Sequence, residues 1–275
     1  MPELPEVETI ARILRQGNDS QPSVMGLTIR GVRLLWERTL AEPSPEQFLA
    51  RIQDQRITGV SRRGKFLILQ LSTDSLLFHL RMSGDLFLES QIRDISPHLR
   101  LSLDLENGLR LVFHDPRKFG RVWLVADAAR QLANLGREPL EDTFTPAKLF
   151  RMLQTRHRQL KPLLLDQAFI AGLGNIYTDE ALHLARLHPL SVSDRLTPEQ
   201  AERLWSSIRT VLQEGIRRNG ASIDWVYRGG DFQNYFRVYQ RTGESCPECG
   251  TQIERIVIGQ RGAHFCPACQ PPPAA

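Results

Sequence analysis

The chain has 275 residues, of which 41% are hydrophobic and 24% are charged. That length and composition fit one large domain or, more readily, two domains with hydrophobic cores, and they exclude collagenous, low-complexity and disordered proteins. No apolar run approaches the roughly 18 residues of a membrane span, and the acidic start at residues 1–6 is unlike a basic and then apolar secretory signal, so we expect a soluble, cytoplasmic protein.

The positive charge of the chain is almost entirely arginine. Lysine and arginine together number 35 against 31 acidic residues, which gives a net charge of +4. The lysines among them are only Lys65, Lys118, Lys148 and Lys161. Because the guanidinium group binds phosphate through paired hydrogen bonds and stacks on bases, the bias favours a nucleic-acid partner. A GC-rich genome with many arginine codons would produce the same bias, so composition alone decides nothing.

The amino-terminal half is predicted to be a helix followed by an antiparallel β-sandwich. Residues 5–16 carry apolar side chains at helical spacing, with a proline in the first turn. A second helix is expected near residues 45–53. Short apolar stretches separated by turn signals are expected to be strands: 27–36, 57–60, 66–71, 76–80, 86–88, 99–105, 109–113 and 122–125. So many short strands, with a hairpin dipeptide at 107–108, indicate a sandwich or a barrel.

The second half is predicted to be helical up to about residue 218, and the chain contains no internal repeat. Thr145 and Thr197 each precede a proline, which is the pattern of an N-cap followed by the first helical residue. Two further helices, 163–170 and 176–187, are separated by a glycine-rich turn. The predicted organisation is an α+β multidomain protein: a sandwich domain with flanking helices over 1–130, a hinge over 131–144, a helical domain over 145–240, a four-cysteine module over 241–270 and a disordered tail over 271–275.

All four cysteines lie after residue 245 and form two pairs. Two residues separate Cys246 from Cys249 and Cys266 from Cys269, and sixteen residues lie between the pairs. This spacing is typical of a four-thiolate zinc ribbon, with a predicted hairpin between the pairs. Because four ligands leave no open position, we expect one structural Zn²⁺ and neither a catalytic metal nor an organic cofactor. His264 is expected to be a bystander.

Two loop motifs have both a functional and a structural interpretation. The glycine-rich turn at 171–175 lies between two predicted helices, where exposed amides can bind an anion or where glycines simply allow close helix packing. Residues 114–121 follow a predicted strand and combine three cations with Phe119. Such a run is either a solvated loop or a loop that enters a DNA groove.

The amino terminus carries the most informative chemistry. Initiator methionine is commonly removed before a small residue such as Pro2, which leaves a secondary amine beside Glu3 and Glu6. An α-amine has a pKa near ~8, well below the ~10.4 of lysine, so it is a nucleophile near neutral pH. A neighbouring carboxylate can act as acid or base. A solvated acidic terminus is the alternative interpretation.

Taken together, these motifs resemble the bacterial formamidopyrimidine-DNA glycosylases of the Fpg/Nei superfamily. The resemblance covers almost the whole chain and follows the order of the family's motifs, at residues 2–8, 63–66, 79–84, 114–120, 161–167, 171–177 and 259–262, together with the cysteine spacing. It implies a helix–two-turns–helix DNA-binding domain and a zinc hairpin after the sandwich. It also implies a monomer that acts on double-stranded DNA containing oxidised bases in the bacterial nucleoid.

For the reaction, the resemblance implies a bifunctional glycosylase and AP lyase that flips oxidised purines (8-oxoguanine, formamidopyrimidines) out of the duplex. The Pro2 amine attacks C1′, the base departs, and an iminium (Schiff base) joins protein to DNA. Glu3 donates a proton to O4′ and Glu6 organises the site, before β- and then δ-elimination cut the strand. Lys65 contacts the phosphate beside the lesion and assists elimination.

The resemblance also implies the DNA contacts. Met82, Arg117 and Phe119 match the residues that fill the gap left by the flipped base, although a methionine is as readily a packed core residue. Asn175 and Arg261 match phosphate clamps. The expected catalytic residues are thus Pro2, Glu3, Lys65 and Arg261, and the remaining expected contacts with DNA are Glu6, His79, Lys161 and Tyr177.

One segment departs from the family's pattern, and two other functions stay open. Residues 219–239 lack the longer, glycine-rich loop that caps the everted base, which leaves the preferred lesion open; Trp225, Tyr227 and Phe232 here either stack on a base or cover the linker. An endonuclease VIII-like enzyme for oxidised pyrimidines would typically begin Pro-Glu-Gly-Pro-Glu and lack the complete gap-filling trio. A non-catalytic zinc-ribbon DNA binder would need neither Pro2 nor Glu3.

Overall fold

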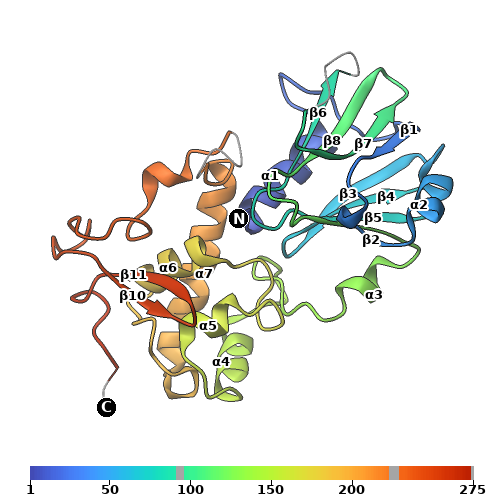
Figure 1. Ribbon diagram of the computed structural model, residues 1–275. Helices are drawn as coiled ribbons and strands as arrows, with labels where there is room; N and C mark the ends of the chain where they lie inside the picture. The colour runs from blue at the N-terminus through green and yellow to red at the C-terminus, as the bar shows by residue number, and fades with distance from the viewer. Residues whose placement is uncertain (91–95, 223–228, 274–275) are drawn as a thin grey trace. The chain divides into compact units, whose positions relative to one another are not determined.

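The computed structural model describes residues 1–90, 96–222 and 229–273, which divide into two compact units (Figure 1). The first unit contains Met1–Ala133 and Asn219–Gly230, and the second contains Asn134–Arg218 and Asp231–Ala275. Among the residues described, no helix combines the length and the apolar character that a membrane crossing requires.

The first unit is built on two β-sheets that share one core, as the sequence predicts. One sheet has the order β1(Ile29–Leu34)–β7(Leu99–Leu105)–β8(Leu109–His114)–β6(Asp85–Ser90), and the other has the order β2(Leu40–Glu42)–β9(Arg121–Val125)–β5(Ser75–His79)–β4(Phe66–Leu71)–β3(Ile57–Arg63). Phe78 of one sheet meets Phe113 of the other edge to face, with ring centroids 5.6 Å apart. Leucines from both sheets complete the same buried cluster. Burying this apolar surface is what holds the sandwich together.

The pairing within the sheets differs from the prediction at one edge. All strand pairs are antiparallel except β2–β9, which is parallel. The sequence predicted antiparallel strands only, and it did not predict β2. A strand of three residues, directly after the 3₁₀-helix at Glu37–Thr39, gives too short an apolar alternation to be recognised.

Two helices of the first unit lie where the sequence predicts them. Helix α1 (Leu4–Gln16) packs on β3 and β4 through a stripe of apolar side chains at helical spacing, among them Val7, Ile10 and Leu14. Helix α2 (Pro45–Ile52) begins at Ser44, whose hydroxyl caps the helix, and buries Phe48 and Ile52. A short helix, α3 (Ala128–Leu132), ends the continuous part of the unit.

The second unit is helical before it reaches the cysteines. It contains α4 (Pro146–Gln154), α5 (Leu160–Leu165), α6 (Asn175–Leu184) and α7 (Pro198–Arg217), with 3₁₀-helices at Ser193–Arg195 and Phe232–Tyr235. Helix α7 packs against α4 and α6. It begins as predicted at Thr197, whose hydroxyl accepts from the Gln200 N–H while the Gln200 side chain accepts from the Thr197 N–H. This reciprocal capping box explains why the helix begins there.

One helix is placed differently from the prediction. The sequence predicted a helix over 163–170, whereas α5 ends at Leu165. The Asp166 carboxylate accepts a hydrogen bond from the Ala168 N–H, two residues on, which offers the backbone a turn in place of another helical step. The chain therefore leaves the helix early.

The segment Asn219–Gly230, which lies within the range 145–240 predicted as one domain, has its contacts in the first unit. The Asn219 side chain accepts a hydrogen bond from Arg12 of α1 at 2.6 Å, and the Ala221 N–H donates to Glu6 of the same helix at 2.8 Å. These bonds fasten the segment to α1. Sequence periodicity cannot reveal such a crossing, because its partners are more than 200 residues apart.

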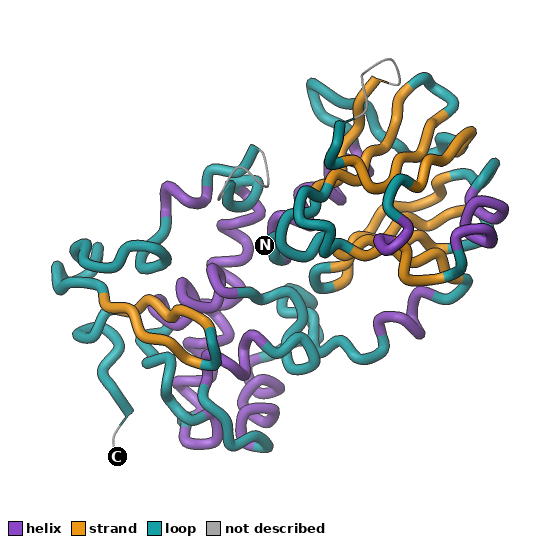
Figure 2. The backbone as a smooth tube through the Cα atoms, viewed as in Figure 1, coloured by secondary structure: helices purple, strands orange, loops and turns teal. Residues whose placement is uncertain are grey.

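The cysteine-rich end of the chain is folded around one hairpin. Strands β10 (Glu254–Ile258) and β11 (Arg261–Phe265) are joined by a two-residue turn, with long loops on both sides of the hairpin (Figure 2). Gly259 and Gln260 both have positive φ, 54° and 65°. Positive φ at both central positions is the requirement of a tight hairpin turn of this type, and the glycine meets it without strain. The predicted hairpin is confirmed.

Candidate functional site

The chain start is held in one place by two buried carboxylates. Pro2 is buried, and Glu3 and Glu6 are 2% and 1% exposed. Glu3 is the N-cap of α1, and its own N–H donates to Glu6 Oε2 at 2.7 Å in a reciprocal capping box. Two acidic groups at a helix amino terminus are favoured by its unpaired amides and its dipole. The terminus is therefore an ordered part of the fold and not a solvated end.

Glu6 joins the chain start to the segment Asn219–Gly230. Its second oxygen, Oε1, accepts the Ala221 N–H at 2.8 Å. Gly220 has φ +82°, and a Cβ there would lie 2.7 Å from the same oxygen, so only glycine fits this approach. One carboxylate thus fixes both the residue after Pro2 and the start of the segment that begins at Asn219.

Lys65 lies in the turn between β3 and β4, beside α1. Arg62 bridges the two elements, since its Nε lies 3.0 Å from Glu8 Oε2 of α1 and its Nη1 donates to the Gly64 carbonyl at 3.1 Å. Lys65 itself is 4% exposed. The sequence reveals the lysine, but it does not reveal that an arginine clamp ties its turn to the helix that carries Glu3 and Glu6.

His79 is a neutral imidazole at the end of β5. Its Nδ1 accepts the Arg81 N–H at 3.1 Å, and its ring meets Phe66 edge to face at 4.8 Å. Burial, helped by the positive charges of Arg81 and Lys65, lowers the pKa of His79 to about 3. With Nδ1 accepting, the proton of the neutral ring is on Nε2, which can donate to an anion.

The lowered pKa of His79 predicts a loss of stability in acid. An unfolded histidine binds a proton near pH 6.5, and the folded one near pH 3, so between these values the unfolded chain binds the extra proton and stability falls as pH falls. The slope is at most about 1.4 kcal/mol per pH unit. We expect His79→Phe to reduce the fall in the free energy of unfolding between about pH 7 and pH 5. Urea unfolding, followed by a spectroscopic signal from the first unit, measures this free energy at each pH. The exposed His98 is the matched control; an equal effect of His98→Phe would contradict the assignment.

Met82, Arg117 and Phe119 are brought together by a hydrogen bond between two turns. Asp115 is fully buried and binds the Ser83 hydroxyl, which connects the turn after β5 to the turn after β8. The other oxygen of Asp115 accepts the Gly120 N–H at 2.7 Å, and the Arg117 N–H lies 3.2 Å from both Asp115 Oδ1 and the Ser83 hydroxyl. Neither Asp115 nor Ser83 was predicted to be functional. The Asp-Pro pair within the cationic loop 114–121 was the available signal.

The side chains on these turns face outward. Phe119 is 50% exposed, Arg117 is exposed and Met82 is half-buried. The Arg117 guanidinium carbon lies 5.0 Å from the centroid of the Phe119 ring, within the range of a cation–π contact. A rigid frame carrying an exposed ring and an exposed cation favours the interpretation that this loop contacts DNA over that of a freely solvated loop.

In the second unit, Asn175 is the first residue of α6, after a braced glycine turn. The Gln167 side chain accepts the Gly172 N–H at 2.9 Å and donates to the Leu173 carbonyl at 2.8 Å. Gly172 has φ 102°, which requires glycine. The amides at the start of α6 and the Asn175 side chain together suit a phosphate.

Two expected DNA contacts are buried in the second unit, and the geometry does not support a direct role for them. Lys161 is fully buried, and its ammonium pairs with Asp179 of α6. Tyr177 is fully buried, stacks on Phe232 at 5.2 Å and fills the space beside Gly215. The sequence gives the residue type but not its depth. Phe232 is fully buried against Tyr177, while Trp225 and Tyr227 lie outside the described residues.

Two acidic residues that the sequence analysis passed over join α6 to the cysteine-rich end. Asp179 Oδ2 accepts the backbone N–H of His264 at 3.0 Å and also pairs with its Nδ1. Glu180 accepts three successive backbone N–H groups at 2.8, 3.0 and 2.9 Å, those of residues 237, 238 and 239. Burial raises the pKa of Glu180, and the three donors counteract part of that rise. Asp179 and Glu180 thus attach both the hairpin and the turn at residues 237–239 to one helix.

The four cysteines form a metal-binding group. Their Sγ atoms all lie within 4.8 Å of one another, with Cys246–Cys269 at 3.9 Å and Cys249–Cys266 at 3.4 Å. A tetrahedral zinc with Zn–S near 2.3 Å places its sulfurs about 3.8 Å apart, so the donor set fits Zn²⁺. His264 is engaged by Asp179, as expected of a residue outside the ligand set. Arg261, at the start of β11, is exposed.

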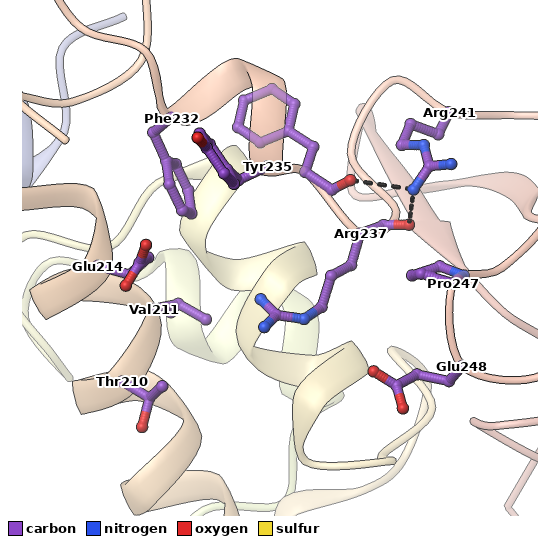
Figure 3. A pocket seen from close by; sticks show the side chains of 10 residues that line it. Thr210, Val211, Glu214, Phe232, Tyr235, Arg237, Arg241, Pro247 and Glu248 are labelled. Carbon is purple, nitrogen blue, oxygen red and sulfur yellow. Dashed lines mark hydrogen bonds between the residues drawn. The ribbon is translucent and has the colours of Figure 1, made fainter.

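A cavity of about 350 Å³ lies apart from these residues, next to α7 and the 3₁₀-helix at Phe232–Tyr235 (Figure 3). Figure 3 shows Arg237 extending into it, while Arg241 donates to the carbonyls of Phe236 and Arg237 at 3.1 Å. Glu214 and Glu248 line it with the two arginines. The mixture of charges selects no anion, and Phe232, buried against Tyr177, is the one lining residue among those described that the sequence analysis considered as a base contact.

Family models match three consecutive parts of the chain. The formamidopyrimidine-DNA glycosylase N-terminal domain matches residues 1–122, the formamidopyrimidine-DNA glycosylase H2TH domain matches 135–226, and a zinc finger found in FPG and IleRS matches 243–272. The three domains in this order define the class of zinc-finger proteins with a helix–two-turns–helix domain to which the fold and the four cysteines point.

Known relatives agree with this class along the whole chain. The formamidopyrimidine-DNA glycosylase of Chloroflexus aurantiacus is 48% identical over 98% of both chains. Lactococcus lactis Fpg, solved with DNA containing N7-benzyl-Fapy-dG, is 35% identical with a TM-score of 0.91, covering 98% of this chain and all of that one. A structure of MutM with DNA containing carbocyclic 8-oxo-G has the same identity, TM-score and coverage. The chain belongs to the formamidopyrimidine-DNA glycosylase family, which confirms the resemblance of its motifs.

Proposed function

We propose that the chain is a base-excision repair enzyme, a bifunctional DNA glycosylase and AP lyase that removes oxidised purines from duplex DNA. Family membership over almost the whole chain supports the activity. The observation that carries the mechanism is the buried arrangement at the chain start, where Pro2 is followed by the buried carboxylates of Glu3 and Glu6. A non-catalytic DNA-binding protein would not need the two buried carboxylates of Glu3 and Glu6 at the start of its chain.

The nucleophile in this proposal is the amine of Pro2 after Met1 is removed. Its nitrogen forms a bond to C1′ of the deoxyribose, the bond from C1′ to the damaged base breaks, and the base leaves with a proton. The C1′–O4′ bond then opens to give the iminium. Because the nitrogen is positively charged, a C2′ proton becomes acidic, and its removal expels the 3′-phosphate in β-elimination; loss of the 5′-phosphate follows in δ-elimination.

Glu3 and Glu6 have different roles in the proposal. Glu3 adjoins the nucleophile and protonates O4′ as the sugar ring opens. Glu6 is a positioning residue, because both of its oxygens are occupied by backbone N–H groups, from Glu3 and from Ala221. Glu6 therefore fixes the position of the chain start relative to the segment that begins at Asn219. It acts on the DNA only through these two neighbours.

The proposed DNA contacts follow from the family's motifs and from the chemistry of the side chains. Lys65 and His79 contact the phosphates beside the lesion, and Met82, Arg117 and Phe119 occupy the gap in the stack. Asn175 and Arg261 contact phosphate from the second unit. We leave Lys161 and Tyr177 out of this set because both are fully buried. Their contribution is to the fold of the unit that carries Asn175.

The proposed enzyme has one metal ion, one subunit and a cytoplasmic substrate. One structural zinc is held by the four cysteines, and the enzyme acts as a monomer on double-stranded DNA with oxidised bases. Because that substrate is the bacterial chromosome, we place the protein in the cytoplasm, at the nucleoid. The boundaries of the sandwich domain, the hinge and the zinc module stay predictions.

Borohydride reduction tests the nucleophile. With the protein freed of Met1 (checked by intact mass) and a duplex containing 8-oxoguanine, we expect a covalent adduct, because an iminium is reduced to a stable amine. Peptide mapping is expected to place the adduct on Pro2. Pro2→Leu retains Met1, because leucine is too large for methionine removal, and is expected to give almost no adduct, while Lys65→Arg keeps it. An adduct that maps to a lysine would overturn the assignment.

A further inference from the structure

A histidine outside the ligand set touches one of the zinc ligands. The Nε2 atom of His183, near the end of α6, lies 3.4 Å from the Sγ atom of Cys246. Both side chains are almost fully buried, at 2% and 3% exposure. An imidazole and a sulfur at this distance are within hydrogen-bond range, and the sulfur belongs to the four-cysteine group.

The other ring nitrogen determines which atom carries the proton. His183 Nδ1 is buried and has no hydrogen-bond partner among the described residues. A buried N–H without an acceptor loses its hydration and gains nothing, whereas a bare ring nitrogen loses less. The proton is therefore placed on Nε2, where it points at Cys246 Sγ. A zinc-bound cysteine is a thiolate, and a thiolate is an acceptor.

The position of His183 on α6 fits this role. Asp179 and Glu180 lie four and three residues before it, so all three side chains share one face of the helix. Asp179 binds β11 and Glu180 binds residues 237–239. His183 is the third contact of that face with the cysteine-rich end and the one that reaches a metal ligand.

We propose that His183 is a hydrogen-bond donor to the zinc-bound thiolate of Cys246 and that this bond increases the affinity of the site for zinc. A donor spreads part of the charge that four thiolates place on one ion and fixes the orientation of the ligand. Groups that hold metal ligands in this way typically alter metal affinity by 10- to 100-fold. The same helix begins at Asn175, so the zinc group and the proposed phosphate clamp are mechanically connected.

Two substitutions in the full-length protein separate donation from packing. His183→Phe keeps an aromatic ring and removes the donor, and we expect zinc to bind roughly tenfold more weakly in competition with a chromophoric chelator. His183→Gln supplies an amide N–H and is expected to recover part of the loss. With Co²⁺ in place of zinc, the sulfur-to-cobalt charge-transfer band is expected at longer wavelength in His183→Phe, because a thiolate without its hydrogen bond is the stronger donor.

The matched control is His188→Phe. His188 is a buried histidine of the same unit whose ring packs on Phe265 at 4.7 Å, so its replacement perturbs packing near the hairpin to a similar degree. We expect wild-type cobalt spectra and zinc affinity there. An unchanged cobalt band and zinc affinity in His183→Phe, or equal losses in His188→Phe, would overturn the proposal. If His183→Phe fails to fold, His183→Gln decides. Because glutamine is expected to restore only part of the hydrogen bond, its cobalt band is expected at longer wavelength than that of the wild type, and an unchanged band would overturn the proposal.

Discussion

Replacing Glu3 by glutamine is expected to lower base excision by roughly 10²- to 10⁴-fold, the range that a general acid contributes. The amide cannot donate the proton that O4′ needs, although it matches the carboxylate in shape. Its oxygen can still accept the N–H of the third helical residue, so the reciprocal cap with Glu6 and the fold of α1 are expected to persist. Single-turnover excision on 8-oxoguanine duplex, alongside equilibrium binding to the same duplex, measures both effects.

The control for Glu3→Gln is Glu8→Gln on the same helix. Glu8 pairs with Arg62 and Arg15, and its replacement by glutamine changes the charge of α1 by the same amount. We expect Glu8→Gln to keep near-normal excision, because its amide oxygen can still accept the hydrogen bond from Arg62 that ties the Lys65 turn to α1. If Glu3→Gln excises at the wild-type rate, Glu3 has no part in the chemistry; if Glu8→Gln falls equally, the effect belongs to the charge of the helix.

The parts of the fold that were predicted correctly have signals that lie close together in the chain. Thr197 and Gln200 are three residues apart and specify the start of α7 by themselves. The cysteine pairs specify a zinc group because the spacing within each pair fixes how two sulfurs can meet. The apolar stripe of α1 and the alternating strands of the sandwich are equally local.

The parts that were missed depend on partners far apart in the chain. Asp179 binds His264, and Glu6 binds Ala221, across 85 and 215 residues. No periodicity encodes such pairs. Depth is hidden for the same reason: Lys161 has the chemistry of a phosphate contact, but the packing of α5 against α6 turns its ammonium inward to Asp179. A single sequence therefore identifies the reactive groups better than the groups that position them.

Alanine at Met82, Arg117 or Phe119 is expected to slow excision from an 8-oxoguanine duplex far more than cleavage at a pre-formed abasic site. Flipping a base costs a few kcal/mol of unstacking, and side chains that fill the gap offset part of it. Losing about 2–3 kcal/mol of that offset corresponds to roughly 10²-fold in rate. An abasic site has no base to extrude, so its cleavage depends less on the same side chains. Parallel single-turnover rates on the two substrates measure the difference.

The exposure of these side chains makes the experiment decisive. Phe119 is 50% exposed and Arg117 is exposed, so their removal is expected to leave the melting temperature within the range of ordinary surface substitutions. Asp115→Ala is the contrasting variant, because it removes the buried acceptor that holds both turns. We expect it to lower the melting temperature and slow both reactions. If Phe119→Ala and Arg117→Ala behave like Asp115→Ala, with equal losses on both substrates, these side chains hold the fold and do not fill the gap.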